Sequence, residues 1–153
     1  MAVEMNDHKA LLADVFEETE NHQWRASEAF LSHAKYPRNM GVIETPDGYG
    51  HETGQCGDSI ELSLRIENNF IRDIKFAPHG CVFTLVCASA VTDLAKGLNL
   101  DQALELEPKD VDVTLGGIPE DHLHCARLAV NTLGTAISDY FARAVIQTKS
   151  AKG

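Results

Sequence analysis

The chain has 153 residues, of which 44% are hydrophobic and 24% charged, a composition typical of one globular domain with its own core. Its 13 basic and 23 acidic residues give a formal net charge of −10, which argues against nucleic acid and anionic membrane surfaces as partners. No apolar run approaches the roughly 18 residues that a membrane span needs. The first eight residues lack a basic segment leading into an apolar core, so we expect no secretory signal and a cytoplasmic protein.

Residues 1–35 are predicted to form an N-terminal helical region that is rich in polar residues. Its apolar residues fall in two patches, one around Leu11 to Phe16 and the other from Trp24 to Leu31. Pro37 ends the region, because its ring and its missing amide exclude further helix. We interpret this region as a helix that packs on the core, with a partner-binding arm as the alternative.

The clearest strand covers residues 59–67, where apolar and polar side chains alternate with a period of two. Asn68-Asn69 is typical of a hairpin turn, since asparagine tolerates a positive φ. A return strand is predicted over residues 70–77, and a third strand within residues 49–55. The return strand is expected to place three side chains on one face: Phe70, Ile74 and Phe76. The sequence thus predicts a small antiparallel three-stranded sheet.

After the sheet the hydrophobic period becomes helical. We expect a helix over residues 82–96 that ends at Gly97, a short helix over 100–106, and one further turn over 110–115. The last helix begins near Leu123, and residues 146–153 are predicted to be a flexible tail. The expected fold is therefore a single α+β domain in which the sheet packs against several helices, with residues 36–145 as its core.

Four cysteines in a chain without an export signal favour metal binding or thiol chemistry over a disulfide framework. Cys56, Cys81 and Cys125 each lie at the end of a predicted element, beside glycine or at a helix start. A helix N-terminus carries roughly half a positive charge, which lowers the pKa of a thiol placed there. Cys125 is therefore a candidate thiolate, and His124 beside it is a candidate nitrogen ligand.

If the ends of the strands and the helix starts meet, the three thiols form one site. Asp58 and His124 would then offer it an oxygen and a nitrogen ligand. Thiolates with imidazole suit zinc or an iron–sulfur cluster. Burial as ordinary core residues is the competing interpretation for the three cysteines.

Other cysteines and histidines fit supporting roles. Cys87 lies six residues into the helix after Cys81 and faces a different side, so we interpret it as a core residue. The alternative is a spare thiol that pairs with Cys81 on oxidation or relays sulfur. His79 and His122, near Cys81 and Cys125 in sequence, would orient the ligands.

Several separated motifs resemble the IscU/NifU-type iron–sulfur cluster assembly scaffolds. They are Pro37-Arg38-Asn39-Met40-Gly41, Cys56-Gly57-Asp58, Gly80-Cys81 followed by a helix of small residues, and His124-Cys125. They occur in the family's order between about Tyr36 and Phe141, and the predicted α+β order agrees with the family's fold.

The resemblance implies a scaffold and carrier rather than an enzyme. Such proteins assemble a transient [2Fe–2S] cluster, take sulfur as persulfide from a cysteine desulfurase, and pass the cluster to apo-proteins. By position, Cys56, Cys81 and Cys125 look like the cluster ligands, with His124 or Asp58 as the fourth. Cys125 resembles the persulfide acceptor, and Asp58 resembles the residue that keeps the cluster labile. Zn²⁺ can occupy the same ligands when iron is absent.

Two features separate this chain from the family pattern. Residues 118–122 carry histidine and acids where the family often has a Pro-Pro-Val-Lys segment that a chaperone recognises, so recognition by a chaperone stays open. The N-terminal helical region also looks longer than in the simplest members. A zinc-dependent sulfurtransferase of the SufU kind on the same fold is the alternative function. The sequence also leaves open whether the protein forms a homodimer around the cluster.

Overall fold

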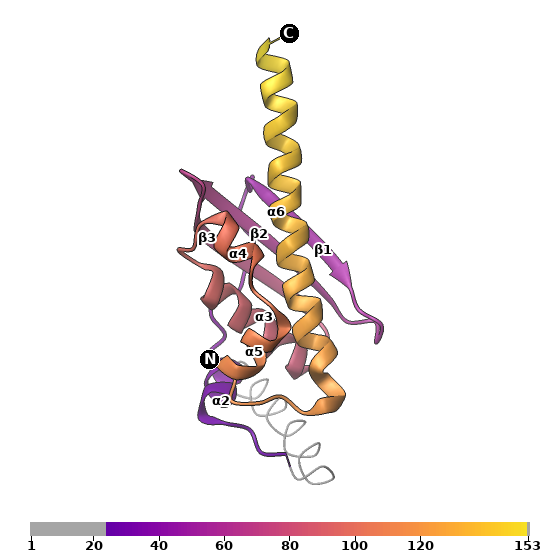
Figure 1. Cartoon of the computed structure of the whole chain (residues 1–153). Coiled ribbons are helices and arrows are strands. Elements are labelled where there is room, and N and C mark those ends of the chain that lie inside the picture. The colour runs from indigo at the N-terminus through magenta and orange to yellow at the C-terminus, as the bar shows by residue number, and fades with distance from the viewer. Residues whose placement is uncertain (1–23, 153) are drawn as a thin grey trace.

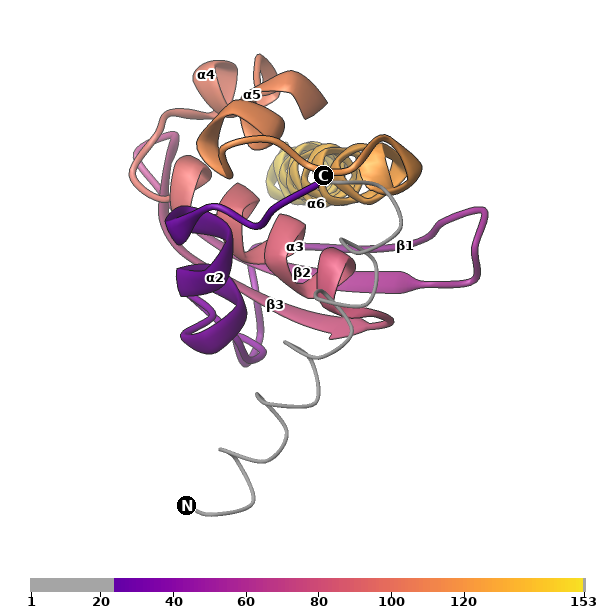
Figure 2. The same ribbon diagram turned by 90° about the horizontal axis from the view of Figure 1, so that it is seen from below.

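The computed structural model describes residues 24–152, with side chains as far as Gln147. It contains a three-stranded antiparallel sheet in the order β1-β2-β3 and helices that pack on it as one domain (Figure 1). The two longest helices, α3 and α6, contact the same face of the sheet, as the view from below shows (Figure 2). This arrangement confirms the predicted α+β fold.

The strands are β1 (Gly48–Thr53), β2 (Ser59–Glu67) and β3 (Phe70–His79). Asn68 and Asn69 form the predicted turn between β2 and β3, with φ values of 52° and 68°. The predicted face of the return strand is wrong at Phe70, which is exposed, whereas Ile71 is buried. The pairing register between β2 and β3 shifts after Arg65, and this irregularity changes which side chains of β3 face the core.

Helix α3 (Val82–Ala95) is buried along almost its whole length, and α6 (Leu123–Lys152) packs beside it on β1 and β2. The approach of α6 to β1 requires glycine, because a Cβ at Gly50 would lie 2.7 Å from the backbone of Thr132 and Ala136. Helix α6 continues to Lys152, through most of the segment for which the sequence predicts a flexible tail. That segment holds no glycine or proline before residue 153, so nothing in the sequence stops the helix earlier.

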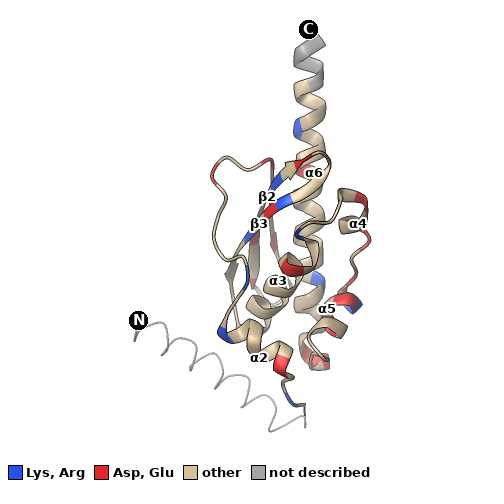
Figure 3. Ribbon diagram, turned by 90° about the vertical axis from the view of Figure 1, so that its left-hand side faces the viewer, with Lys and Arg blue, Asp and Glu red and all other residues tan. Residues whose placement is uncertain are grey.

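The described residues also form three shorter α-helices: α2 (Glu28–Lys35), α4 (Leu100–Leu104) and α5 (Pro108–Thr114). Pro108 is the first residue of α5, where its fixed φ favours helix initiation. In the predicted N-terminal region, residues 24–27 are not helical and α2 begins at Glu28, while residues 1–23 lie outside the described part. Acidic side chains gather on α4, α5 and the segment between them (Figure 3).

Two polar networks tie α2 to the rest of the domain. The buried Nδ1 of His33 lies 2.7 Å from the Ser89 hydroxyl on α3, and the backbone amide of Arg38 donates to the same hydroxyl at 2.8 Å. The Ser27 hydroxyl, which caps α2, also donates to the carbonyl of Leu115. No helix among residues 24–152 is both long and apolar enough to cross a membrane.

Candidate metal and thiol site

The candidate site lies where the connection between two strands meets the starts of two helices. Cys56 and Asp58 belong to the connection between β1 and β2, and Cys81 is the residue that precedes α3. Cys125 is the third residue of α6, and η1 (Glu120–His122) leads directly into that helix. The chain order of strand, helix and loop thus brings residues that are 69 positions apart, 56 and 125, to one edge of the domain.

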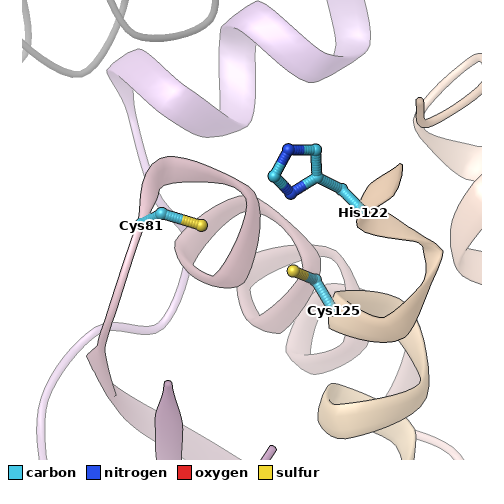
Figure 4. Close-up of side chains that lie close together, drawn as sticks. All are labelled: Cys81, His122 and Cys125. Carbon is cyan, nitrogen blue, oxygen red and sulfur yellow. The ribbon is translucent and has the colours of Figure 1, made fainter. Parts of the chain in front are cut away.

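Three of these side chains form a compact group. The ligand atoms of Cys81, His122 and Cys125 all lie within 4.8 Å of one another, and their side chains point toward a common centre (Figure 4). Cys125 is fully buried, whereas Cys81 is exposed. Two sulfurs and one imidazole nitrogen are a donor set that suits Zn²⁺ or iron. The group therefore fits a metal ion that enters from the Cys81 side.

Asp58 connects the group to the turn before β2. Its carboxylate accepts hydrogen bonds from the Cys81 amide at 3.2 Å and from the Thr84 hydroxyl at 2.6 Å. Partial burial acts to raise the pKa of Asp58, but hydrogen bonds from Thr84, Cys81 and Cys56 outweigh it and lower that pKa. A side chain at Gly80 would collide with this carboxylate, so glycine is required before Cys81.

The two thiols of the group differ in acidity. The pKa of Cys81 is lowered to about 6, chiefly because the Cys125 thiol hydrogen-bonds to it, and backbone amides at the start of α3 add to the effect. The pKa of Cys125 is raised by the same contact with Cys81 and by burial. The lowered pKa expected for a thiol at a helix start is thus found at Cys81, whereas the pKa of Cys125 moves in the opposite direction. Cys81 stands at an exposed helix start, whereas Cys125 is buried in the core.

The structure places His124 apart from the three-residue group. The His124 ring centroid lies 5.9 Å from that of His122, and His124 lines a separate cavity of about 200 Å³ beside Gly54 and Gln55. Cys56 is exposed on the same turn and lies near the Asp58 carboxylate. The sequence-predicted residues thus share one edge, but Cys56 and His124 stand outside the compact group.

Sequence reasoning assigned His122 only an orienting role. A usable signal was present, because His122 and Cys125 are three residues apart at a helix start and so lie on the same side of that helix. Cys87, in contrast, is fully buried in α3 among core residues, which confirms its interpretation as a core residue. Burial also raises the pKa of the Cys87 thiol well above its ordinary value.

Known proteins are similar to this chain in sequence and in fold. The family model described as the NifU-like N-terminal domain matches residues 25–147. The chain is 38% identical over 116 residues to iron-sulfur cluster assembly scaffold protein IscU 1 of Archaeoglobus fulgidus, covering 75% of this chain and 76% of that protein. It is 37% identical over 117 residues to the scaffold protein IscU of Aquifex aeolicus, covering 74% of each.

A solved structure agrees at the level of fold. The crystal structure of a nitrogen-fixing NifU-like protein, N-terminal part, from Brucella abortus superposes with a TM-score of 0.60 at 15% identity. The match covers 76% of this chain and 94% of that one. The chain therefore belongs to the NifU-like N-terminal domain family, among the IscU/NifU-type iron–sulfur cluster assembly scaffolds.

Proposed function

We propose that this protein is a cytoplasmic scaffold that assembles a [2Fe–2S] cluster and passes it to apo-proteins. Its sulfur would come as persulfide from a cysteine desulfurase, and an external donor would supply the electrons that reduce it to sulfide. The observation that carries the proposal is the meeting of Cys81 and Cys125 with Asp58 at one edge of a domain of this family.

The three cysteines Cys56, Cys81 and Cys125 are the proposed ligands of the cluster, which is cargo and not a resident cofactor. Cys56 is exposed on the turn that also carries Asp58, so the ligand set reaches from a buried thiol to the protein surface. A cluster held at such an edge is accessible to an acceptor protein. Asp58 offers a hard oxygen beside soft sulfur ligands, which is consistent with weak retention of the cluster.

Cys125 is the proposed persulfide acceptor. Its sulfur would attack the outer sulfur of the desulfurase persulfide, a new S–S bond would form on Cys125, and the desulfurase thiolate would leave. Since Cys125 is fully buried, this step requires the surroundings of Cys125 to open when the desulfurase docks. The acidic helices α4 and α5 suit a basic partner surface, although their charge also serves solubility (Figure 3).

The test is anaerobic purification followed by analysis of metal and acid-labile sulfide, and then reconstitution with iron, cysteine and a cysteine desulfurase. We expect a cluster that absorbs visible light, and we expect Cys56→Ala, Cys81→Ala and Cys125→Ala each to abolish it. Cys87→Ala is the matched control and should keep the cluster. Loss of the cluster in Cys87→Ala alone would overturn the ligand assignment.

A zinc-dependent sulfurtransferase is the second candidate, and the compact grouping of Cys81, His122 and Cys125 favours it, since three close ligands suit a single metal ion. Zinc alone in the purified protein does not decide between the two functions, because zinc can fill an empty scaffold site. Failure of desulfurase and iron to build any cluster on the zinc-free protein would favour the sulfurtransferase.

A further inference from the structure

We propose that His122, and not the neighbouring His124, supplies the nitrogen ligand to a single divalent metal ion held by Cys81 and Cys125. The inference rests on the proposed function, since it refines how the scaffold site receives metal. It departs from the assignment that the resemblance to the family implies, in which His124 or Asp58 is the fourth ligand.

The geometry of the compact group supports His122. Its ring nitrogen and the sulfurs of Cys81 and Cys125 all lie within 4.8 Å of one another. Ligand atoms around a tetrahedral zinc ion are about 3.5–3.8 Å apart, given the usual Zn–S and Zn–N bond lengths. The three side chains therefore need to approach by only about 1 Å to bind a metal ion of this size.

Helical position explains why the two histidines differ. His122 precedes Cys125 by three residues, and side chains at this spacing share one side of a helix. His124 is one residue from Cys125, which turns its side chain about 100° away around the helix axis. In agreement, His124 lines the cavity beside Gly54 and Gln55.

Aromatic packing fixes the His122 ring in place. The ring stacks on Phe83 of α3, with centroids 3.8 Å apart and an angle of 11° between the ring planes. Phe83 also packs against Trp24 and Phe30, whose ring centroids lie 5.7 Å and 5.5 Å from its own. Phe83 and Trp24 are thus positioning residues, which act on the metal through His122.

The loop that carries His122 is also tied down. The Trp24 indole donates a hydrogen bond to the carbonyl of Gly117 at 3.1 Å, and the Ser27 hydroxyl donates to the carbonyl of Leu115. These bonds join residues 24–27 to the segment just before η1. A ligand that is already ordered loses little conformational freedom when a metal binds, so this support should raise metal affinity.

The experiment is an anaerobic titration of the zinc-free full chain with Co²⁺. Thiolate-to-cobalt charge transfer reports the cysteine ligands, and the visible d–d bands report the whole ligand set. The decisive variant is His122→Phe, which removes the nitrogen but keeps an aromatic ring on Phe83. His124→Phe is the matched control, and circular dichroism checks that each variant is folded.

We expect His122→Phe to weaken Co²⁺ binding by roughly 100-fold or more, because losing a direct ligand should cost at least as much as losing an outer partner. The d–d bands should change, while His124→Phe keeps both the affinity and the spectrum of the wild type. Trp24→Leu should weaken binding by about 10-fold without changing the d–d bands. Loss of binding in His124→Phe with an unchanged His122→Phe would overturn the proposal, and so would two unchanged variants.

A second readout assigns the ligand directly. Histidine side-chain ¹⁵N NMR during Zn²⁺ titration should shift a ring nitrogen of His122 and leave both nitrogens of His124 in place. These experiments need neither desulfurase nor sulfide. Normal Co²⁺ binding through His122 together with failed cluster reconstitution would contradict the proposed function alone. Successful reconstitution with His124 as the cobalt ligand would contradict this inference alone.

Discussion

Two regions of the molecule, a packed layer and a thiol edge, are held together by different interactions. The packed layer, which consists of the covered face of the sheet with α3 and α6, is held by fully buried apolar side chains and by close backbone contact at Gly50. The thiol edge, which consists of Cys56, Asp58, Cys81, His122 and Cys125, is held by a few hydrogen bonds and one ring stack, and only Cys125 of this group is part of the core. Stability should therefore depend on the packed layer, and metal and sulfur chemistry on the thiol edge.

The largest expected effect on stability is in the packed layer at Gly50. Gly50→Ala should lower the free energy of unfolding by about 3 kcal/mol, because its Cβ would meet the backbone of Thr132 and Ala136 and cannot move aside. Gly134→Ala on α6 is the control: nothing lies within 4 Å of its added Cβ, so it should stabilise the helix by about 1 kcal/mol. Urea denaturation measures both, and equal stabilities would contradict the role of this contact.

Serine substitutions at two cysteines should separate the two regions. Cys87→Ser places a hydroxyl in the apolar core and should cost about 2 kcal/mol of stability, yet leave cluster reconstitution intact. Cys81→Ser should change stability by less than about 0.5 kcal/mol, because the site is exposed and serine is a favourable N-cap, yet abolish the cluster. Urea denaturation of both variants measures their stability, and cluster reconstitution measures their ability to assemble the cluster. A Cys87→Ser variant that keeps its stability but cannot assemble the cluster would contradict this separation of the two regions.

Substitution of Asp58 should have an intermediate effect on stability. Asp58→Ala removes the acceptor for the Cys81 amide and the Thr84 hydroxyl and should cost about 1 kcal/mol of stability. In the same variant we expect the reconstituted cluster to persist longer, since the hard oxygen ligand is gone. The decay of visible absorbance under air measures the lifetime, with Asp58→Asn as a control that keeps one acceptor oxygen. Faster decay in Asp58→Ala would refute the lability argument.

The smallest expected effect is the pH dependence of the α2 attachment. Burial is the main cause that lowers the pKa of His33 below 6.5, with the charge of Arg38 adding to it and that of Asp93 opposing it. Between the lowered pKa and 6.5 the unfolded chain binds more protons than the folded one. Stability is therefore fully present above pH 6.5 and falls as the pH drops below it, by at most about 1.4 kcal/mol per pH unit.

His33→Asn is the variant that tests this dependence, because asparagine can keep the contact with Ser89 but does not titrate. Urea denaturation between pH 7 and pH 5 should show a shallower loss of stability in the variant than in the wild type. Identical pH profiles would show that His33 does not contribute.

Sequence patterns predicted most of the fold because its elements are defined locally. The alternation over β2, the Asn68-Asn69 turn and the helical period after Cys81 each depend on neighbouring residues only. The register shift after Arg65, which exposes Phe70, could not be predicted, because it depends on how β2 and β3 pair. The raised pKa of Cys125 could not be predicted for a related reason, since it depends on the contact with Cys81 and on burial.

By itself, the sequence determined the family, the α+β class and the cysteines worth testing, because motifs and hydrophobic periods are properties of the chain. Only the tertiary structure decided which of these side chains meet. It grouped Cys81, His122 and Cys125, whereas His124 lines another cavity. The physical reason is that a ligand set depends on two things: where α3 and α6 lie on the sheet, and which side of its helix each side chain occupies. Residue spacing determines only the side of the helix, so the position of the helices has to come from the tertiary structure.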